Sequence, residues 1–322
     1  MATRTGEQVI AIEEHYWDRE MAATYNDGAT GGSQKMRMLL EDIEGERLKT
    51  MDSGGIDIQV LSHGAPASQR LDPKTAVALT RGVNDRLRDI CAARPDRFAG
   101  FAALPTTVPE ACADELERAV RDLGMKGAMV HGLTGDGVFF DDRRFWPVYE
   151  RAQALDVPLY MHPAVPHRAV VDAYYKDYVG DYPALLNAAW GFTVETATQG
   201  IRIVLSGVLD EYPDVKIILG HLGEGLPFLL WRIDHALSRP GNKKVNFREK
   251  FSRNFWITTS GNFSDPALIC SIQELGTDRI LFSIDYPFVE NAPGVEWMER
   301  VHLNQEDKNK ILHGNAKKLL KM

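Results

Sequence analysis

The chain is poor in cysteine, in long apolar runs and in blocks of positive charge. Its 322 residues contain three cysteines without CxxC spacing, which argues against a thiolate metal site and predicts reduced thiols in a cytosolic protein. No apolar run approaches the roughly 20 residues of a membrane span. The N-terminal MATRTGEQV lacks the apolar core of a signal peptide. We therefore expect a cytoplasmic protein with no membrane partner.

The shortage of basic clusters bears on possible partners. With a net charge of −8 and no dense group of lysine and arginine, the chain has nothing to neutralise a run of phosphates, so nucleic acid is not an expected partner. What the chain does have is 44% hydrophobic residues, enough for a large core. Its length would allow two domains, but α/β barrels of this size form one. No shift in composition marks a boundary, and we predict a single domain over residues 1–322.

Short apolar or β-branched runs recur at eight places and alternate with segments of helical length. Most of the runs are continuously apolar, as expected for strands that a parallel sheet buries on both faces. The predicted strands are 9–12, 56–62, 98–104, 127–131, 157–162, 215–221, 255–261 and 280–285, and the clearest helices are 73–95, 109–124 and 262–276. Eight such units predict a (β/α)8 barrel. The alternative is a doubly wound open sheet, but no GxGxxG follows the first strand. The Gly-rich segment 18–35 is expected to be a loop over the end of that strand.

Histidines gather where the predicted strands end. Five of the nine, at positions 15, 63, 131, 162 and 221, lie at or just after such an end, and the eighth strand ends in Asp285. In a barrel these ends meet on one face, where active sites form. Glu13 and His15 are two residues apart, so an extended chain points both to the same side. Together with His162 and Asp285 they predict a three- or four-ligand site for one divalent ion, Zn²⁺ or Mn²⁺ before Mg²⁺.

Each of these residues also has a purely structural interpretation. A single histidine at a strand end is more often a hydrogen-bonded structural residue than a ligand, and Glu13 with His15 could form a surface turn. Only the coincidence with His162, His221 and Asp285 favours a metal site. His63 and His131 could line the pocket. The remaining histidines, at positions 167, 235, 302 and 313, are expected near the site or on the surface.

The stretch GHLGEGLPFLLWRIDHAL, residues 220–237, contributes a second pair of candidates. Glu224 follows His221 by three residues, and a carboxylate there can hold the second N–H of the imidazole and raise its basicity, which would make a proton-transfer dyad. The alternative is that Glu224 is a favourable negative charge at a helix start. Arg232 could bind an anionic group or pair with a carboxylate near Asp234.

Several of these stretches together resemble a known family. AIEEHYW, YMHP, GHLGEGLPFLLWRIDHA, ITTSGNF and RILFSIDYPFVE are similar to motifs of the metal-dependent aromatic acid decarboxylases of the amidohydrolase superfamily, of the γ-resorcylate and 2,3-dihydroxybenzoate type. The resemblance extends from Ile10 to about Leu320. It implies a distorted (β/α)8 barrel, one divalent metal held by Glu13, His15, His162 and Asp285, and a homodimer or homotetramer. Glu13 stands where a typical amidohydrolase has the first His of HxH, as in these decarboxylases.

The resemblance also implies a reaction and a substrate. The substrate is a small aromatic carboxylate with an ortho hydroxyl, which Asp285 protonates at the ipso carbon before CO₂ is lost. His221 with Glu224 would manage the phenol or water proton, and Arg232 and His63 would contact the substrate. Two alternatives remain open at this point. One is a metal-dependent hydrolase of a lactone or amide, and the other is a barrel that binds a small molecule without turnover. The ring substituents are not determined.

Overall fold

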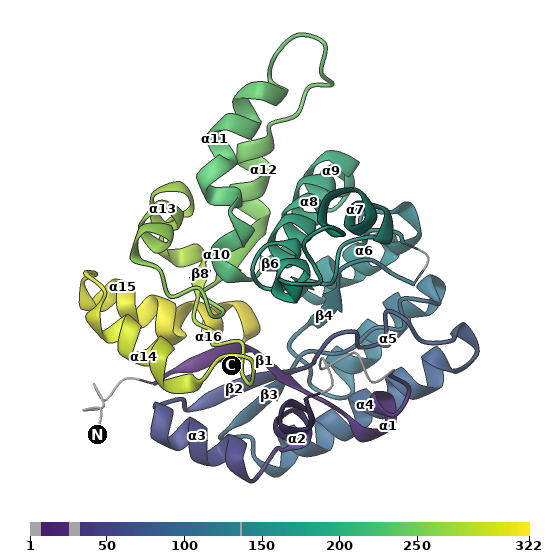
Figure 1. Cartoon of the computed structure of the whole chain (residues 1–322), viewed down its shortest axis with the longest axis vertical. Coiled ribbons are helices and arrows are strands. Elements are labelled where there is room, and N and C mark those ends of the chain that lie inside the picture. The colour runs from purple at the N-terminus through teal and green to yellow at the C-terminus, as the bar shows by residue number, and fades with distance from the viewer. Residues whose placement is uncertain (1–7, 26–32, 136) are drawn as a thin grey trace.

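The strands of the barrel follow one another around a ring. The structure, a computed structural model, describes residues 8–25, 33–135 and 137–322. All eight predicted strands are present in the described chain (Figure 1). Their bounds are β1 Ile10–Tyr16, β2 Ile58–His63, β3 Phe98–Gly100, β4 Ala128–His131, β5 Pro158–His162, β6 Lys216–Leu219, β7 Phe255–Thr258 and β8 Ile280–Leu281. β3 and the last three strands are shorter than predicted, so Asp285 lies in the segment beyond β8 and His221 is the first residue of α10 (His221–Glu224).

Hydrogen bonds close this ring. β1, β2 and β3 pair in parallel in that order, and so do β4 through β8. The two groups meet where Ala102 pairs with Ala128, and the His15 N–H donates to the Tyr286 carbonyl over 2.7 Å between β1 and the segment after β8. The predicted distorted (β/α)8 barrel is therefore confirmed, and the doubly wound alternative is excluded.

Helices surround the barrel on the outside (Figure 1). The predicted helices at 73–95, 109–124 and 262–276 appear as α4, α5 and α13. The α-helices are α1 Arg19–Ala22, α2 Gln34–Glu41, α3 Glu46–Gly54, α4 Pro73–Ala93, α5 Pro109–Arg121, α6 Trp146–Leu155, α7 Arg168–Val170, α8 Gly191–Ser206, α9 Val208–Glu211, α10 His221–Glu224, α11 Leu226–Leu237, α12 Phe247–Asn254, α13 Asp265–Leu275, α14 Asn291–Arg300, α15 Gln305–Asn309 and α16 Asn315–Leu320. Within the described ranges, none has the length and apolar character that crossing a bilayer would need.

The segment 18–35, expected as a loop, is partly helical. Asp18 caps α1 by accepting from the backbone N–H groups of Glu20 and Met21, and Ser33 caps α2 through Met36. Such side-chain caps satisfy backbone N–H groups at the start of a helix that have no partner within the helix. Residues 26–32 lie outside the described residues.

The core has two layers that the strands separate. Inside the barrel, apolar side chains from seven strands or their ends pack with the C-terminal helix α16, and they include Ile10, Ile12, Met129, Tyr160 and Ile218. The larger outer layer packs the other strand faces against the helices. Because the barrel interior is filled, polar groups that face inward are confined to its mouth at the carboxyl ends of the strands.

Candidate metal centre and active site

A bulge in β1 turns Glu13 and His15 into the mouth. Ile10 and Ile12 pack inside the barrel, and strict alternation would send Glu14 to the same side. The pairing of β1 with β2 shifts between Ala11 and Glu14, which is the signature of a β-bulge. The extra residue changes the phase of the strand, so Glu13 and His15 share the mouth and Glu14 points away from it.

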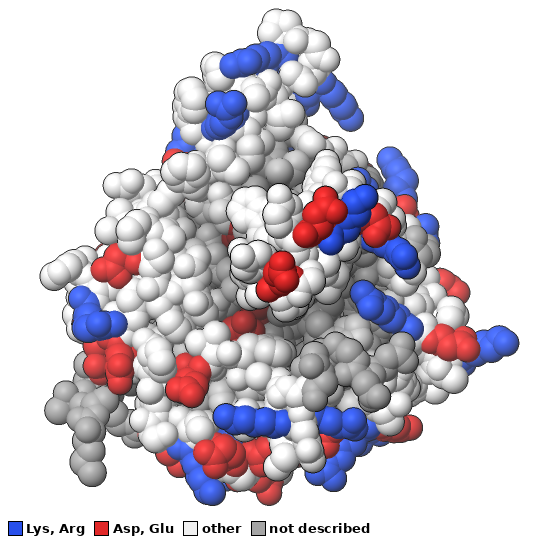
Figure 2. Space-filling view, viewed as in Figure 1, with Lys and Arg blue, Asp and Glu red and all other residues white. Residues whose placement is uncertain are grey.

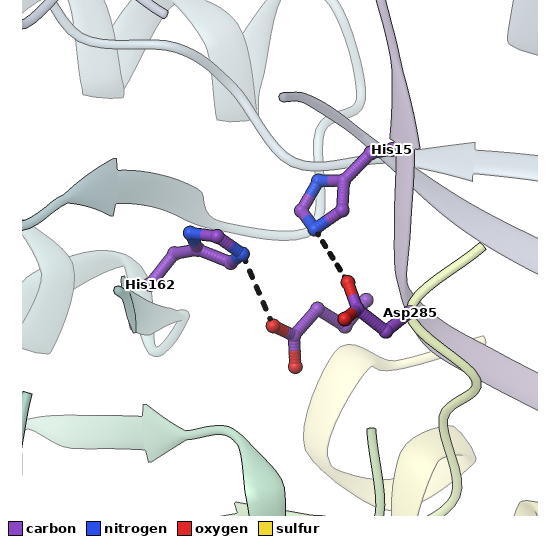
Figure 3. A group of neighbouring side chains, drawn as sticks. His15, His162 and Asp285 are labelled. Carbon is purple, nitrogen blue, oxygen red and sulfur yellow. Dashed lines mark ion pairs between the residues drawn. The ribbon is translucent and has the colours of Figure 1, made fainter. Parts of the chain in front are cut away.

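Four side chains converge there from three strands or their following loops. Glu13 and His15 come from β1, His162 from the end of β5 and Asp285 from the loop after β8. Each offers one ligand atom, and these atoms lie within 4.8 Å of one another. The His162 Nε2 lies 3.3 Å from Glu13 Oε1, and the His15 Nε2 lies 3.3 Å from Asp285 Oδ1 (Figure 3). The structure thus brings together all four residues that the sequence singled out as ligands.

Glu13 is held by one carboxylate oxygen and leaves the other without a hydrogen bond. Its Oε2 accepts from the hydroxyls of Tyr160, Thr258 and Ser260. Its Oε1 is buried and has no hydrogen-bond partner in the described chain. Gly220 makes this position possible, because a methyl group there would lie 2.9 Å from Glu13 Oε2. Burial raises the pKa of Glu13 above its usual value, so a nearby cation would favour its charged form.

His162 is presented in the tautomer that a metal needs. Its Nδ1 lies 2.7 Å from the Pro163 carbonyl oxygen, which can only accept, so Nδ1 carries the proton and Nε2 keeps its lone pair. His131 supports this arrangement. The His131 Nε2 donates to the His63 carbonyl over 2.8 Å, so its Nδ1 carries no proton. This Nδ1 lies 2.9 Å from the His162 Nδ1 and can accept its proton in a hydrogen bond. Burial, with the nearby imidazoles of His131 and His15, holds the pKa of His162 well below its usual value.

His221 and Glu224 lie on a left-handed turn. Four consecutive residues from His221 to Glu224 have φ between 49° and 76°, and Gly225 follows with φ 74°. This conformation costs non-glycine residues roughly 1–2 kcal/mol each, and it brings the Glu224 carboxylate to 2.7 Å from His221 Nδ1. Burial lowers the pKa of His221, but Glu224, Glu13 and Asp285 outweigh it and raise the pKa well above its usual value. His221 and Glu224 therefore have the hydrogen-bonded arrangement that the proposed dyad needs.

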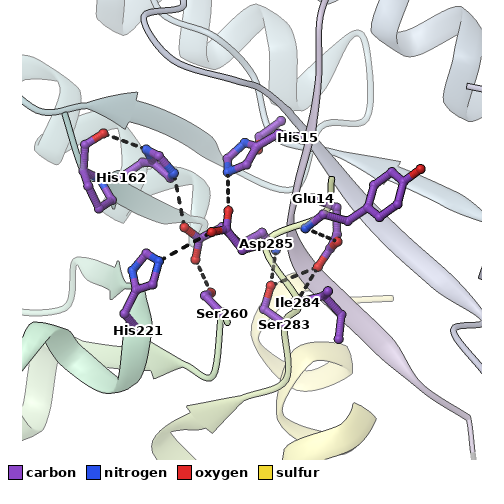
Figure 4. Close-up of polar contacts among 12 residues, drawn as sticks. Glu14, His15, His162, His221, Ser260, Ser283, Ile284 and Asp285 are labelled. Carbon is purple, nitrogen blue, oxygen red and sulfur yellow. Dashed lines mark hydrogen bonds and ion pairs between the residues drawn. The ribbon is translucent and has the colours of Figure 1, made fainter. Parts of the chain in front are cut away.

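Asp285 also has a left-handed backbone, with φ 77°. Its Oδ2 lies 3.7 Å from His221 Nε2 (Figure 4). Burial raises the pKa of Asp285, but the nearby imidazoles of His15 and His221 outweigh it and lower the pKa. Glu14 holds the backbone on both sides: its carboxylate accepts from the N–H groups of Ile284 and Tyr286 at 2.9 and 3.2 Å, and from the Ser283 hydroxyl at 3.1 Å.

The site opens into a cavity of about 1550 Å³, whose lining includes His162, His221 and Asp285. Two predicted substrate contacts do not line it. His63 uses both ring nitrogens on the backbone, since Nδ1 lies 3.0 Å from the Gly64 carbonyl and Nε2 accepts from the Asp18 N–H at 3.0 Å. Arg232 is exposed on α11. A single chain therefore brings neither residue to the cluster.

Sequence reasoning missed several residues that shape the site. These are Glu14, Tyr160, Thr258, Ser260, Gly220 and Phe288, the last of which lines the cavity with its ring centre 5.8 Å from that of His15. The hydroxyl-rich ITTSG stretch at the end of β7 carried a usable signal, because three hydroxyl side chains stand where an apolar strand ends at the same mouth. The sequence left the role of His131 open, with the pocket lining as one possibility, and His131 lies among the lining residues of the cavity.

The donor set fits a divalent cation. Glu13 Oε1 and His15 Nε2 are buried without hydrogen-bond partners among the described residues, and an unpaired buried polar atom is costly unless a ligand completes it. Two imidazoles and two carboxylates suit Zn²⁺ or Mn²⁺. The cysteines take no part, since all three are free thiols away from this cluster.

A closed parallel barrel with clustered carboxylate and imidazole groups at the carboxyl ends of its strands is typical of a class, the metal-dependent barrel enzymes. The family model described as Amidohydrolase matches residues 13–322. The chain therefore belongs to the amidohydrolase family.

Its relatives within that family are decarboxylases. The chain is 42% identical to a gamma-resorcylate decarboxylase of Polaromonas sp. over 97% of this chain and 98% of the relative, and 41% identical to one of Rhizobium sp. with the same coverage. A solved 2,6-dihydroxybenzoate decarboxylase in complex with 2,6-dihydroxybenzoate has a TM-score of 0.89 at 40% identity, covering 98% of this chain and 100% of that one. A dihydroxybenzoic acid decarboxylase of Polaromonas sp. with bound manganese and 2-nitroresorcinol has a TM-score of 0.88 at 39% identity, covering 98% and 97%. The expected membership among the aromatic acid decarboxylases of this superfamily is confirmed.

Proposed function

We propose that the protein is a metal-dependent nonoxidative decarboxylase of an ortho-hydroxybenzoate of the dihydroxybenzoate type. The observation that carries the proposal is the position of Asp285, which belongs to the four-residue cluster, lies between His15 and His221 and lines the cavity. Relatives named for this reaction at about 40% identity over nearly the whole chain support it.

Glu13, His15, His162 and Asp285 would hold the ion. When bound, a divalent cation would orient the phenol and carboxylate oxygens of the substrate and disperse their charge. Phe288, half exposed to the cavity, offers an aromatic face beside the position of the ring.

The residues of the chain would supply the proton. His221 has a raised pKa, so it holds its proton near neutral pH, with Glu224 stabilising the imidazolium. Its Nε2 lies 3.7 Å from Asp285 Oδ2, where it can share that proton with the carboxylate. Asp285 then protonates the ipso carbon. A C–H bond forms, the bond to the carboxylate breaks, and its electron pair restores the aromatic ring as CO₂ leaves. The one proton consumed is replaced from solvent through His221.

The test is CO₂ release by the metal-loaded enzyme from 2,6- and 2,3-dihydroxybenzoate, alongside a panel of lactones and amides. We expect Asp285→Asn to abolish release, while Asp181→Asn, an exposed aspartate away from the cavity lining, keeps it. Lactone or amide opening without any CO₂ would instead support the hydrolase alternative. Binding of a dihydroxybenzoate with neither reaction would support a barrel without turnover.

The metal itself is tested by elemental analysis of the purified protein. We propose Mn²⁺ or Zn²⁺, and a related structure with bound manganese supports the first. Less than one equivalent in His162→Ala, against one in the wild type, is the expected result. An equal metal content in both proteins would contradict the ligand assignment.

We also propose that the chain forms a homodimer or homotetramer of single-domain subunits. Helix α11 projects from the body beside α12 (Figure 1) and exposes Phe228 and Trp231, at 80% and 62% of their surface. Homodimer interfaces are more apolar than the rest of a protein surface, so a second copy of the chain is the partner that would cover these two side chains. Light scattering should give a dimer or tetramer for the wild type, and a smaller particle for the double variant Phe228→Ser, Trp231→Ser.

The free thiols support a reducing, cytoplasmic location.

A further inference from the structure

Three buried hydroxyl side chains meet at one oxygen of Glu13 and form what we call the hydroxyl cluster. They belong to Tyr160 in β5, to Thr258 at the end of β7 and to Ser260 just after it. Tyr160 lies two residues before His162, so both side chains point into the barrel, with Tyr160 one layer deeper. Glu13 comes from β1, and the whole group therefore comes from odd-numbered strands, as alternate strands fill one layer of a barrel interior.

The strand between β5 and β7 leaves room for this cluster. β6 lies between them in the barrel wall, and Gly220 follows its last residue. A methyl group on Gly220 would lie 2.9 Å from Glu13 Oε2 and 3.3 Å from the Tyr160 hydroxyl oxygen. Because Gly220 has no side chain, hydroxyls from the strands on both sides of β6 can reach the same carboxylate oxygen.

The two oxygens of the Glu13 carboxylate have opposite surroundings. Oε2 accepts from the hydroxyls of Tyr160 and Ser260, and from that of Thr258 at 3.3 Å (Figure 4). The hydroxyls also contact one another, since the Tyr160 oxygen lies 3.0 Å from that of Thr258, and Thr258 contacts Ser260. Oε1 has no hydrogen-bond partner in the described chain and lies 3.3 Å from His162 Nε2. The cluster thus holds one oxygen and leaves the other for the metal site.

The hydroxyl cluster is separate from the walls of the cavity. The cavity opens at the hollow in the centre of the face that Figure 2 shows, and its described lining includes Asp285 and His221 but none of the three hydroxyl residues. A hydroxyl has one proton to donate, and an ionised carboxylate only accepts. The contacts of the cluster therefore place it to act on Glu13 and not on a substrate.

We propose that the hydroxyl cluster positions Glu13 for the metal ion, so that Oε1 alone faces the other ligands. The torsion that turns a glutamate carboxylate is broad, so an unrestrained Glu13 could present either oxygen. Three donors to Oε2 restrict this rotation before the ion binds, and such preorganisation raises affinity. Tyr160, Thr258 and Ser260 are then positioning residues for the metal. The inference rests on the ligand set of the proposed function and deepens it.

The first test removes one buried tyrosine hydroxyl from the cluster and one from elsewhere. Mn²⁺ is titrated into the metal-free protein and followed by calorimetry. Tyr160→Phe should weaken Mn²⁺ binding by about 10- to 100-fold, the usual effect of losing a group that orients a ligand. Tyr149 on α6 is equally buried and donates to the Phe140 carbonyl, so Tyr149→Phe is the matched control and should leave Mn²⁺ affinity unchanged.

The second test separates the hydroxyl of Thr258 from its shape. Thr258→Val keeps the branched side chain without the hydroxyl and should weaken Mn²⁺ binding. Thr258→Ser keeps the hydroxyl without the methyl group and should retain most of the affinity. Urea unfolding of each metal-free variant shows whether it is folded, and this pair decides the inference if Tyr160→Phe does not fold.

The outcomes separate this inference from the proposed function. If folded Tyr160→Phe and Thr258→Val bind Mn²⁺ as tightly as the wild type, the inference is overturned and the proposed function stands. The same conclusion follows if Thr258→Ser loses as much affinity as Thr258→Val, or Tyr149→Phe as much as Tyr160→Phe. If the wild type binds Mn²⁺ but releases no CO₂ from any hydroxybenzoate, the proposed function fails and the titrations still decide the inference. Binding of neither Mn²⁺ nor Zn²⁺ overturns both.

Discussion

Glu14 illustrates how a residue beside a reactive group can act without touching substrate. It lies fully buried behind the mouth, and its carboxylate joins β1 to the backbone around Asp285, 270 residues further along the chain. The Gln59 amide donates to it at 3.3 Å, and Gln59 in turn accepts from the buried Arg47 guanidinium at 2.9 Å. Because Asp285 has a left-handed backbone, which few non-glycine residues adopt without support, this network keeps its carboxylate directed at the cluster.

We predict that Glu14→Gln weakens metal binding by about 10- to 100-fold, the usual effect of losing a group that orients a ligand. The new amide N–H₂ would face the backbone donors of Ile284 or Tyr286 and cannot accept from them. Metal titration by calorimetry, with CO₂ release as a second readout, measures the effect. The exposed Glu299 provides the control as Glu299→Gln. Unchanged metal affinity in a folded Glu14→Gln variant would show that the contact is only structural.

At the scale of elements, the short turn α10 decides where His221 and Glu224 lie. A right-handed helix starting directly at His221 would direct the two side chains differently. Gly223 and Gly225 both have left-handed φ, but their surroundings differ. A methyl group on Gly223 would lie 2.9 Å from both Ile257 Cγ2 and Pro227 Cδ, whereas one on Gly225 would have no neighbour within 4 Å.

This difference makes the two glycines a matched pair. We predict that Gly225→Ala lowers the free energy of unfolding by about 1 kcal/mol, since it adds only backbone strain. Gly223→Ala adds a clash and should cost a further ~1–3 kcal/mol, and kcat should fall because the turn carries His221 and Glu224. Urea unfolding and steady-state kinetics give both numbers. Equal costs for the two variants would mean that the turn relaxes freely.

At the scale of the whole molecule, buried histidines make the fold sensitive to acid. Burial lowers the pKa of His63 to about 4 and that of His131 to about 3, and it holds the pKa of His162 well below its usual value. An unfolded chain binds these protons near pH 6.5, and the folded chain does not. Stability from such lowered pKa values is therefore present above pH 6.5 and is lost as the pH falls.

We expect these three histidines to lower the free energy of unfolding of the metal-free protein as the pH drops from about 6.5 to about 4, against the opposite contribution of Glu14, whose pKa burial raises to about 8. His63→Gln removes one titrating group, and its fall between pH 7.5 and 4.5 should be smaller than that of the wild type by roughly 2–3 kcal/mol. Urea unfolding at both pH values measures this difference. The same fall in both proteins would mean that His63 takes up its proton without unfolding.

The barrel and most of the metal cluster could be predicted from the sequence because both depend on local order along the chain. Apolar or β-branched runs at eight places, most of them continuous, predict parallel strands, and the ends of such strands meet on one face whatever the details of packing. Glu13, His15 and His162 stand at strand ends, and Asp285 follows a strand closely, so their convergence needed no knowledge of side-chain contacts.

Other features depended on directions and contacts that only the tertiary structure decides. The bulge in β1 assigns Glu13 and Glu14 to opposite sides, the left-handed turn directs His221 toward Asp285, and backbone partners occupy both nitrogens of His63. Arg232 faces outward because α11 projects from the body. The physical reason is that a one-residue change of phase or a reversed φ reverses where a side chain points. Partners distant in the sequence settle that choice, as Asp18 does for His63 and Ile284 for Glu14.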